Sequence, residues 1–180
     1  MAKLKILTDE NPRLYLKSRE ITEVNGRIKT LLDDMVETMH EANGVGLAAP
    51  QVGVLRRCVV VETTPGEIYK LVNPVIIESS GEQVGKEGCL SVPNRDGTVT
   101  RPNYVKVKAL NENGEEIIVE GTELLARCLC HELDHLDGIL YTKKASQIFE
   151  YDDEGNIIST EDKANWTLFF SEHLFLQKRF

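Results

Sequence analysis

The pentapeptide HELDH at residues 131–135 constrains the fold of this chain more than any other segment. His131 and His135 are four residues apart, and on an α-helix this spacing places both imidazoles on one face, where they can bind a single cation. Glu132 stands beside them and can reach a water molecule on that cation. The chain holds only 4 histidines, so a chance pairing of two of them around a glutamate is a poor explanation. The pattern predicts a helix that binds a metal ion.

A catalytic metal site needs a third protein ligand and an open coordination position for water. The best candidate for this ligand is Cys89, in the sequence EGCLS at residues 87–91. Gly88 gives the backbone room for a close approach, and a thiolate with two neutral imidazoles leaves the fourth position of the metal open. Taken alone, Cys89 is equally well explained as a small buried apolar residue. Its combination with the HELDH helix favours a metal ligand.

Two segments are expected to form helices, and the first has the apolar periodicity of an amphipathic helix. The first spans Asn25–Ala42, and the residues on its apolar face are Ile28, Leu31, Leu32, Met35, Val36 and Met39. The second contains HELDH. We expect it to begin near Thr122, an N-cap residue followed by Glu123 at the positive end of the helix dipole, and to end at Gly138.

The chain between these two helices has the pattern of an antiparallel sheet. From Arg56 to Glu120, short β-rich runs alternate with turn residues, and these runs are residues 58–61, 69–72, 75–77, 104–108 and 117–119. Asn113-Gly114 is typical of a two-residue hairpin turn, and Lys3–Leu7 has the alternation of a short first strand. A helix, a block of strands and a second helix indicate an α+β fold.

The length of 180 residues suits one compact domain. We expect a catalytic domain over residues 1–148 and a C-terminal extension over residues 149–180. Within the extension, Tyr151–Asp162 is acidic and predicts a linker or a hairpin. Trp166–Phe180 is strongly apolar and predicts a helix whose apolar face is covered by its own domain or by a second chain.

A third segment, GVGLAAPQ at residues 44–51, follows the first helix. It lacks the spacing of a phosphate-binding loop and has no Lys-Ser/Thr pair after it, so a nucleotide site is a poor interpretation. A turn that ends the helix is the simple explanation for Gly44 and Gly46. Gln51 stands out because a side-chain amide can donate a hydrogen bond to a developing oxyanion.

The segments GVGLAAPQ, EGCLS and HELDH, in this order, resemble the three signature motifs of peptide deformylases. The resemblance runs from about Leu4 to about Lys143. It implies antiparallel β-sheets packed around a central HExxH helix in a single domain, followed here by a C-terminal helical tail. It also implies metal-dependent hydrolysis of the N-formyl group of N-formylmethionyl peptides of nascent proteins, with release of formate.

The resemblance also implies a role for individual residues. The metal ligands would be Cys89, His131 and His135. Glu132 would act as general acid and base, while Gln51 and the backbone N–H of Leu90 would bind the oxyanion. Val45 and Gly46 would pair with the substrate backbone as an added strand. The residues near the methionine pocket would be Leu124 and Cys128.

The family usually employs one divalent ion, ferrous iron in the cell, and Zn²⁺, Ni²⁺ or Co²⁺ can replace it; a thiolate and two imidazoles are compatible with all four. The expected partners are nascent peptides near the ribosome. The segment PNRDG at residues 93–97 departs from the Gln-Arg pattern of some members. Whether Arg95 or Arg101 contacts the substrate is therefore open at this point.

Composition excludes several other classes of function. A formal net charge of −8 and a pI near 5.1 argue against charge-driven nucleic-acid binding, which needs clustered Lys and Arg. No apolar run approaches the roughly 20 residues of a membrane span, and the first residues lack the apolar core of a signal peptide. These features predict a cytoplasmic enzyme that binds neither nucleic acid nor membranes.

Two alternatives use the same helix. A HExxH metalloprotease acting on internal peptide bonds would share HELDH but gives no role to Cys89 or Gln51. A non-catalytic metal-binding module would close the site with a fourth ligand from Cys58, Cys128 or Cys130, and would not need Glu132.

Overall fold

The computed structural model describes residues 3–163. Its α-helices are α1 (Gly26–Glu41) and α2 (Glu123–Leu136), and its short 3₁₀ helices are η1 (Pro12–Tyr15), η2 (Ala49–Val52) and η3 (Tyr141–Lys143). The strands are β1 (Gly46–Ala48), β2 (Cys58–Val61), β3 (Tyr69–Ser80), β4 (Gln83–Cys89), β5 (Val92–Arg101), β6 (Tyr104–Leu110), β7 (Glu116–Thr122), β8 (Gln147–Tyr151) and β9 (Ile157–Asp162). Every pairing between these strands is antiparallel. The expected α+β class with antiparallel sheets is confirmed.

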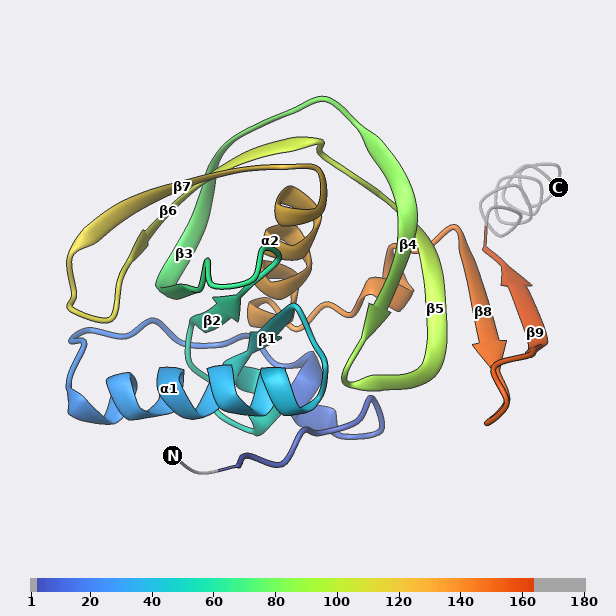
Figure 1. The fold of residues 1–180 in the computed structure, drawn as a ribbon, viewed down its shortest axis with the longest axis horizontal. Coiled ribbons are helices and arrows are strands. Elements are labelled where there is room, and N and C mark those ends of the chain that lie inside the picture. Colours follow the sequence, from blue (N-terminus) through green and yellow to red (C-terminus); the bar gives the residue numbers. More distant parts are fainter. Residues whose placement is uncertain (1–2, 164–180) are drawn as a thin grey trace, which may run out of the picture.

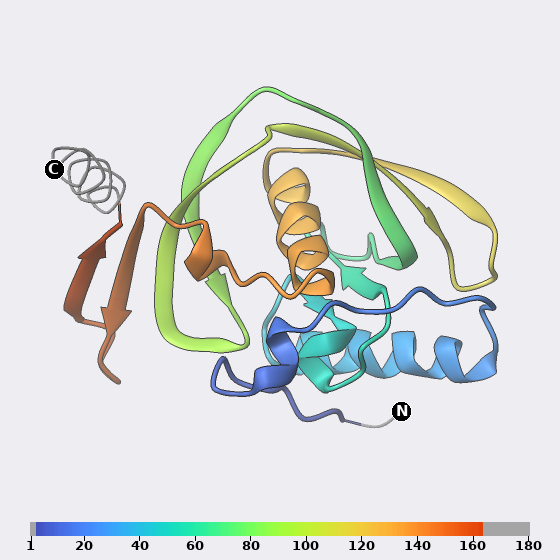
Figure 2. The ribbon, with the colours of Figure 1, turned by 180° about the vertical axis from the view of Figure 1, so that it is seen from behind.

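The strands form two sheets that curve around α2. One sheet has the order β1-β2-β3-β6-β7 and the other β4-β5-β8-β9. Figures 1 and 2 show α2 inside the curve of the two sheets, while α1 runs along the opposite side of β1 and β2. The hairpin β8–β9 lies at the outer end of the second sheet.

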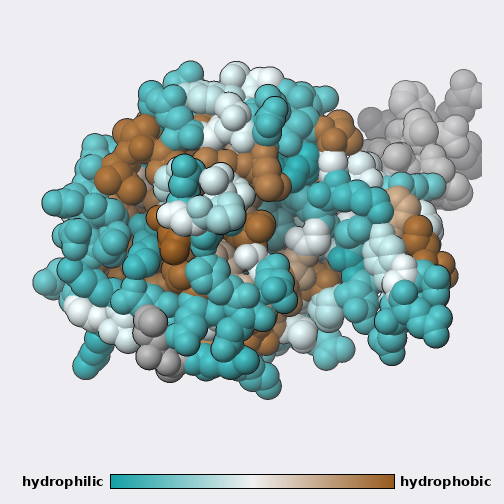
Figure 3. Space-filling model, in the orientation of Figure 1, coloured by the Kyte–Doolittle hydropathy of each residue, from teal (hydrophilic) through white to brown (hydrophobic). Residues whose placement is uncertain are grey.

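The alternation of β2 explains this layering. Successive side chains of a strand point to opposite faces, and all four residues of β2 are buried. Val59 and Val61 pack in the cluster that contains α2. Cys58 and Val60 pack in the cluster that contains α1. The first sheet is therefore covered on both faces here, and Figure 3 shows the hydrophilic residues around the rim of the molecule.

Both predicted helices exist, but their ends differ in chemistry. The Asn25 side chain caps α1 by accepting hydrogen bonds from the backbone N–H groups of Arg27 and Ile28. Thr122 occupies the N-cap position of α2, as expected, but its side chain makes no capping hydrogen bond. Gly138 follows the C-cap of α2 with a φ of +72°. A Cβ there would lie 2.5 Å from the Tyr15 carbonyl oxygen, so only glycine fits.

The strand predictions need two corrections. Lys3–Leu7 forms no strand; its alternating apolar residues pack on the α1 cluster, and its backbone is anchored by the Leu7 N–H, which donates to Gln51 O at 2.7 Å. The two runs 69–72 and 75–77 belong to one strand, β3, which passes through irregularities in its pairing with β6. Bulges of this kind interrupt side-chain alternation without ending a strand.

The acidic segment Tyr151–Asp162 contains a hairpin turn rather than a linker. Its turn is closed by Asp152, whose Oδ1 accepts hydrogen bonds from the backbone N–H groups of Glu154 and Asn156. β8 pairs with β5 from Thr98↔Gln147 to Arg95↔Glu150, so the hairpin continues the second sheet. The position 148/149 falls inside β8. The apolar helix expected at 166–180 lies outside the described residues.

None of the helices in residues 3–163 combines the length and the apolarity needed to cross a membrane.

Candidate metal centre

Cys89, His131 and His135 meet at one point of the structure. Their candidate ligand atoms all lie within 4.8 Å of one another, and Cys89 Sγ is 3.2 Å from His135 Nε2. Metal bonds of about 2.3 Å to sulfur and about 2.0–2.1 Å to imidazole nitrogen suit a cluster of this size. Within residues 3–163 this is the one group of three such side chains close enough to share an ion.

Two local features of the chain place these ligands. In α2 the spacing of four residues brings His131 and His135 onto one face, with their ring centroids 5.0 Å apart. In β4 the pairing with β5 shifts between Gly88 and Cys89, so that Cys89 pairs with Val92. A shift of this kind redirects a side chain, and Cys89 reaches the histidines of α2.

The surroundings of these side chains fit a divalent transition metal. Burial lowers the pKa of His135, which favours the neutral imidazole that a metal ligand must be. Glu132 Oε2 is buried and has no hydrogen-bond partner among the described residues. A buried carboxylate oxygen without a hydrogen-bond partner destabilises the folded protein. A ligand at this position would supply the missing partner.

A second carboxylate, Glu87, orients one of the histidines. His131 Nδ1 lies 2.9 Å from Glu87 Oε2, which leaves Nε2 for the metal. Arg101 donates to both oxygens of Glu87, from Nε at 2.8 Å and from a terminal nitrogen at 2.9 Å. Burial raises the pKa of Glu87, but the hydrogen bonds with Arg101 and His131 outweigh it and lower the pKa to about 2. Glu87 is therefore a fixed anion behind His131.

Glu132 has the opposite balance. Burial raises its pKa to about 7, a value that suits a group which must take up and release a proton near neutral pH. Gly46 leaves the space in front of it: a Cβ on Gly46 would lie 2.4 Å from Glu132 Oε1 and 2.8 Å from Cys128 Sγ. Because Gly46 has no side chain, β1 lies against the Glu132 carboxylate. Any larger residue at this position would displace the Glu132 side chain.

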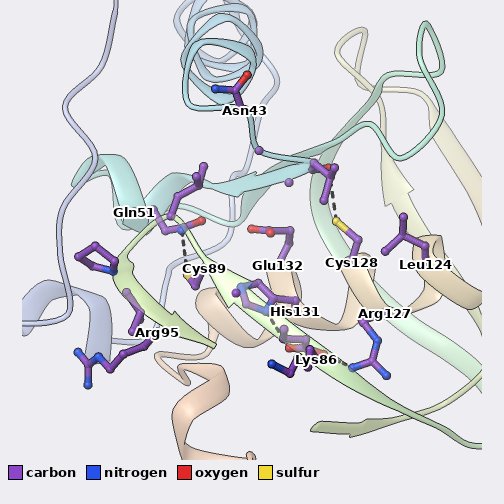
Figure 4. A pocket seen from close by; sticks show the side chains of 18 of the residues that line it. Asn43, Gln51, Lys86, Cys89, Arg95, Leu124, Arg127, Cys128, His131 and Glu132 are labelled. Carbon is purple, nitrogen blue, oxygen red and sulfur yellow. Dashed lines mark hydrogen bonds and ion pairs between the residues drawn. The ribbon is translucent and has the colours of Figure 1, made fainter. Parts of the chain in front are cut away.

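Gln51 is held in one orientation at the edge of the cluster. Its Oε1 accepts from the backbone N–H of Ala48 at 2.8 Å. Its Nε2 donates to Ser91 Oγ at 3.1 Å and lies 3.5 Å from Cys89 Sγ. The amide nitrogen therefore lies on the side of Cys89, one of the candidate ligands, as Figure 4 shows.

A cavity of about 430 Å³ opens over this centre. Of the ten site residues expected from the sequence, nine line it: Val45, Gly46, Gln51, Cys89, Leu90, Leu124, Cys128, His131 and Glu132. His135 completes the cluster beside Cys89. The Cys128 thiol donates to the carbonyl oxygen of Val45 at 3.4 Å, and burial raises its pKa, so it is a neutral wall of the cavity.

The structure distinguishes Arg95 from Arg101, the two arginines whose contact with the substrate the sequence left open. Arg95 lines the cavity, whereas Arg101 is buried and bridges Glu87 to Asp134. Sequence reasoning missed Arg127, which donates to Glu87 Oε1 at 2.8 Å and to the carbonyl oxygen of Val99 at 3.0 Å. Its signal was its position four residues before His131, on the same face of the helix.

Comparison with known proteins agrees with this geometry. The family model described as "Polypeptide deformylase" matches residues 3–150. The peptide deformylase of Agathobacter rectalis is 60% identical over 144 residues, covering 80% of this chain and 90% of that protein. The crystal structure of peptide deformylase from Thermotoga maritima aligns with a TM-score of 0.78 at 35% identity, covering 81% of this chain and 99% of that one. That from Legionella pneumophila also gives 0.78 at 35% identity, covering 99% of both chains. This chain belongs to the polypeptide deformylase family, and it is a metal-binding hydrolase.

Proposed function

We propose that this chain removes the formyl group from the N-formylmethionine of nascent proteins through the residues around Cys89. The observation that carries the proposal is the meeting of one thiol and two imidazoles beside a carboxylate whose pKa is about 7. The proposed ligands are Cys89, His131 and His135. A bound divalent ion would supply Lewis-acid polarisation and lower the pKa of a water molecule.

Glu132 moves the proton in this scheme. Its carboxylate takes a proton from the attacking water at the cavity floor, and the same oxygen passes that proton to the amine nitrogen that leaves the formyl carbon. A pKa of about 7 allows both halves of this cycle at neutral pH. The products are formate and a free amino terminus, so the atoms balance with water as the only co-reactant.

Gln51 and the Leu90 N–H stabilise the negative charge. Gln51 is already oriented by Ala48 and Ser91, so its amide nitrogen is held close to the place where charge develops on the formyl oxygen. Leu90 follows Cys89 directly and lines the cavity. Val45 and Gly46 pair with the peptide backbone as an added strand. Leu124 and Cys128 receive the methionine side chain.

Several broader features belong to the same proposal. Ferrous iron is the ion in the cell, and zinc, nickel or cobalt can replace it. α2 is the central helix of a single catalytic domain over residues 1–148, and residues 149–180 form an extension. The enzyme works in the cytoplasm on peptides emerging from the ribosome, without specific contacts to nucleic acid.

Neither alternative is favoured. A protease for internal peptide bonds leaves Gln51 without a role, although its amide is fixed beside Cys89. A closed structural site would need a fourth ligand. In the described part of the chain, Cys58, Cys128 and Cys130 are absent from the group that can share an ion.

Metal analysis of anaerobically purified protein, combined with turnover of formyl-methionyl peptides, tests the proposal. We expect about one ion per chain and release of formate. Cys89→Ser should alter which metal is retained and slow its loss to air, because the thiolate is the soft, oxidisable ligand. Unchanged metal content and air sensitivity in that variant would remove Cys89 from the ligand set.

A further inference from the structure

Cationic side chains line the mouth of the cavity, whereas the carboxylates of its lining are buried at the metal centre. The described residues that line the cavity include the cations Lys86, Arg95 and Arg127. Their acidic counterparts in the lining are Glu87 and Glu132, which are both buried at the metal centre. The carboxylates that pair with the outer cations contribute nothing to the lining.

Two of the cations reach solvent. Lys86 pairs with Asp96 at 3.3 Å, and the exposed fractions of the two side chains are 53% and 24%. Arg95 pairs with Asp9, with exposed fractions of 34% and 21%. In each pair the cation is the more exposed partner. Arg127 differs because it is buried and spends its donors on Glu87 and backbone carbonyls. Figure 4 shows Lys86 and Arg95 on the side of the cavity opposite Asn43.

The C-terminal hairpin holds Lys86 in place. Lys86 Nζ donates to Tyr151 Oη at 2.8 Å, and this hydroxyl donates to Asp96 Oδ2 at 2.8 Å. The ammonium also lies 4.3 Å from the centre of the Phe149 ring, a distance at which cation–π attraction operates. The hydrogen bond with Tyr151 raises the pKa of Lys86. An ammonium has three donors, so one remains for a substrate oxygen.

We propose that Lys86 and Arg95 form a cationic rim that favours formyl peptides with an acidic side chain after the methionine, an inference that rests on the proposed function. Tyr151 is a positioning residue for this rim, because its hydroxyl fixes Lys86. Tyr151 lies just beyond the segment 3–150 that the family model matches. The hairpin thus contributes to substrate choice, although it contributes no side chain to the cavity itself.

The test uses amidated tripeptides, formyl-Met-Ala-Xaa and formyl-Met-Xaa-Ala, in which Xaa is Glu, Gln or Lys. In one of these two peptide series, we expect kcat/KM for the Glu peptide to exceed kcat/KM for the Gln peptide by about three- to fivefold at low ionic strength. The difference should appear in KM with kcat unchanged, because the charge lies away from the reacting atoms. It should fall toward unity at about 1 M salt, where the Debye length is about 3 Å.

Variants of the rim locate the effect. Lys86→Gln and Arg95→Gln should each lower the ratio of kcat/KM for the Glu peptide to kcat/KM for the Gln peptide. Lys86→Glu should bring this Glu/Gln ratio below one and make the Lys peptide the preferred substrate. Tyr151→Phe should lower the Glu/Gln ratio while kcat on the Gln peptide is retained. Lys106→Gln is the matched control, since Lys106 pairs with Glu120 on the first sheet; it should keep the wild-type ratio.

The outcomes separate the two proposals. Failure to turn over the Gln peptide by the metal-loaded enzyme would contradict the proposed function. Turnover of the Gln peptide with a Glu/Gln ratio of one or less would overturn the cationic rim and leave deformylation intact. A wild-type ratio that persists in both Lys86→Gln and Lys86→Glu would also overturn it.

Discussion

The layer between β4 and α2 and the hairpin β8–β9 are both rich in charged side chains, but only the first buries them. Glu87 and Arg101 have side chains that are 4% and 3% exposed, whereas all residues of β9 are exposed. Buried ion pairs lose their hydration and depend on exact partners, while exposed pairs contribute little. The same residue types therefore orient His131 in one region and remain exposed to solvent in the other.

The largest expected effect lies at the metal centre. Glu132→Gln removes the proton carrier but keeps the shape and the three ligands, so kcat should fall by about 10²–10⁴ with the metal retained. Formate release and metal content on the same sample would measure this. Activity within about tenfold of the wild type would show that Glu132 does not carry the proton.

Glu87→Gln should damage the buried layer next. It leaves Arg127 without an anion and Arg101 with Asp134 alone, and breaking a buried pair costs about 3–5 kcal/mol of stability. It should also weaken metal affinity by about 10- to 100-fold through His131. Urea unfolding and chelator competition measure the two effects. The control is Glu116→Gln, because Glu116 pairs with Lys108 and the two side chains are 59% and 50% exposed; this change should cost less than about 1 kcal/mol. Equal losses in the two variants would remove the distinction between buried and exposed ion pairs.

The hairpin has one buried anchor, and its removal should give an intermediate effect. Ile148 on β8 is 7% exposed and packs with Val99 and Tyr141. Ile148→Ala should lower the free energy of unfolding by about 2 kcal/mol, whereas Ile158→Ala on β9, at 61% exposure, should change it by less than about 0.5 kcal/mol. Thermal unfolding of both variants compares them; a larger loss at Ile158 would mean that β9 is covered.

The smallest effect concerns the hairpin turn and pH. Hydrogen bonds from Asn156 lower the pKa of Asp152, and the bond from its side chain contributes more than the bond from its backbone. A folded-state pKa below the unfolded value gives stability that is present above about pH 4 and lost as the pH falls further. The protection factors of the amides in β8 and β9, which correct for the pH dependence of intrinsic exchange, should therefore fall below about pH 4. Asp152→Asn should weaken this loss of protection, and identical pH profiles of protection would show that the turn is insensitive to the protonation of Asp152.

The sequence predicts residues whose signal is local and misses those whose role depends on distant partners. The spacing of His131 and His135 is readable because it lies within one helix. Glu87 belongs to a motif recognised for Cys89, yet its contact with His131 crosses 44 residues. The sequence does not predict β4 and β5 as separate strands, because Gly85, Gly88 and Gly97 interrupt the alternation of apolar and polar side chains. The burial of Arg101 follows only from the packing of both strands against α2.

The proposed metal ligands are divided between β4 and α2, and this division has a consequence for the order of folding. Cys89 and His135 are separated by 46 residues, and the chain between them includes β5, β6 and β7. Closing so long a loop costs conformational entropy before any metal bond can compensate. The two histidines alone would bind an ion weakly, and the Cys89 thiolate would reach them only after β4 has docked on α2. Tight metal uptake should therefore be a late event in folding, and its rate should report the completion of the native structure rather than the formation of the helix.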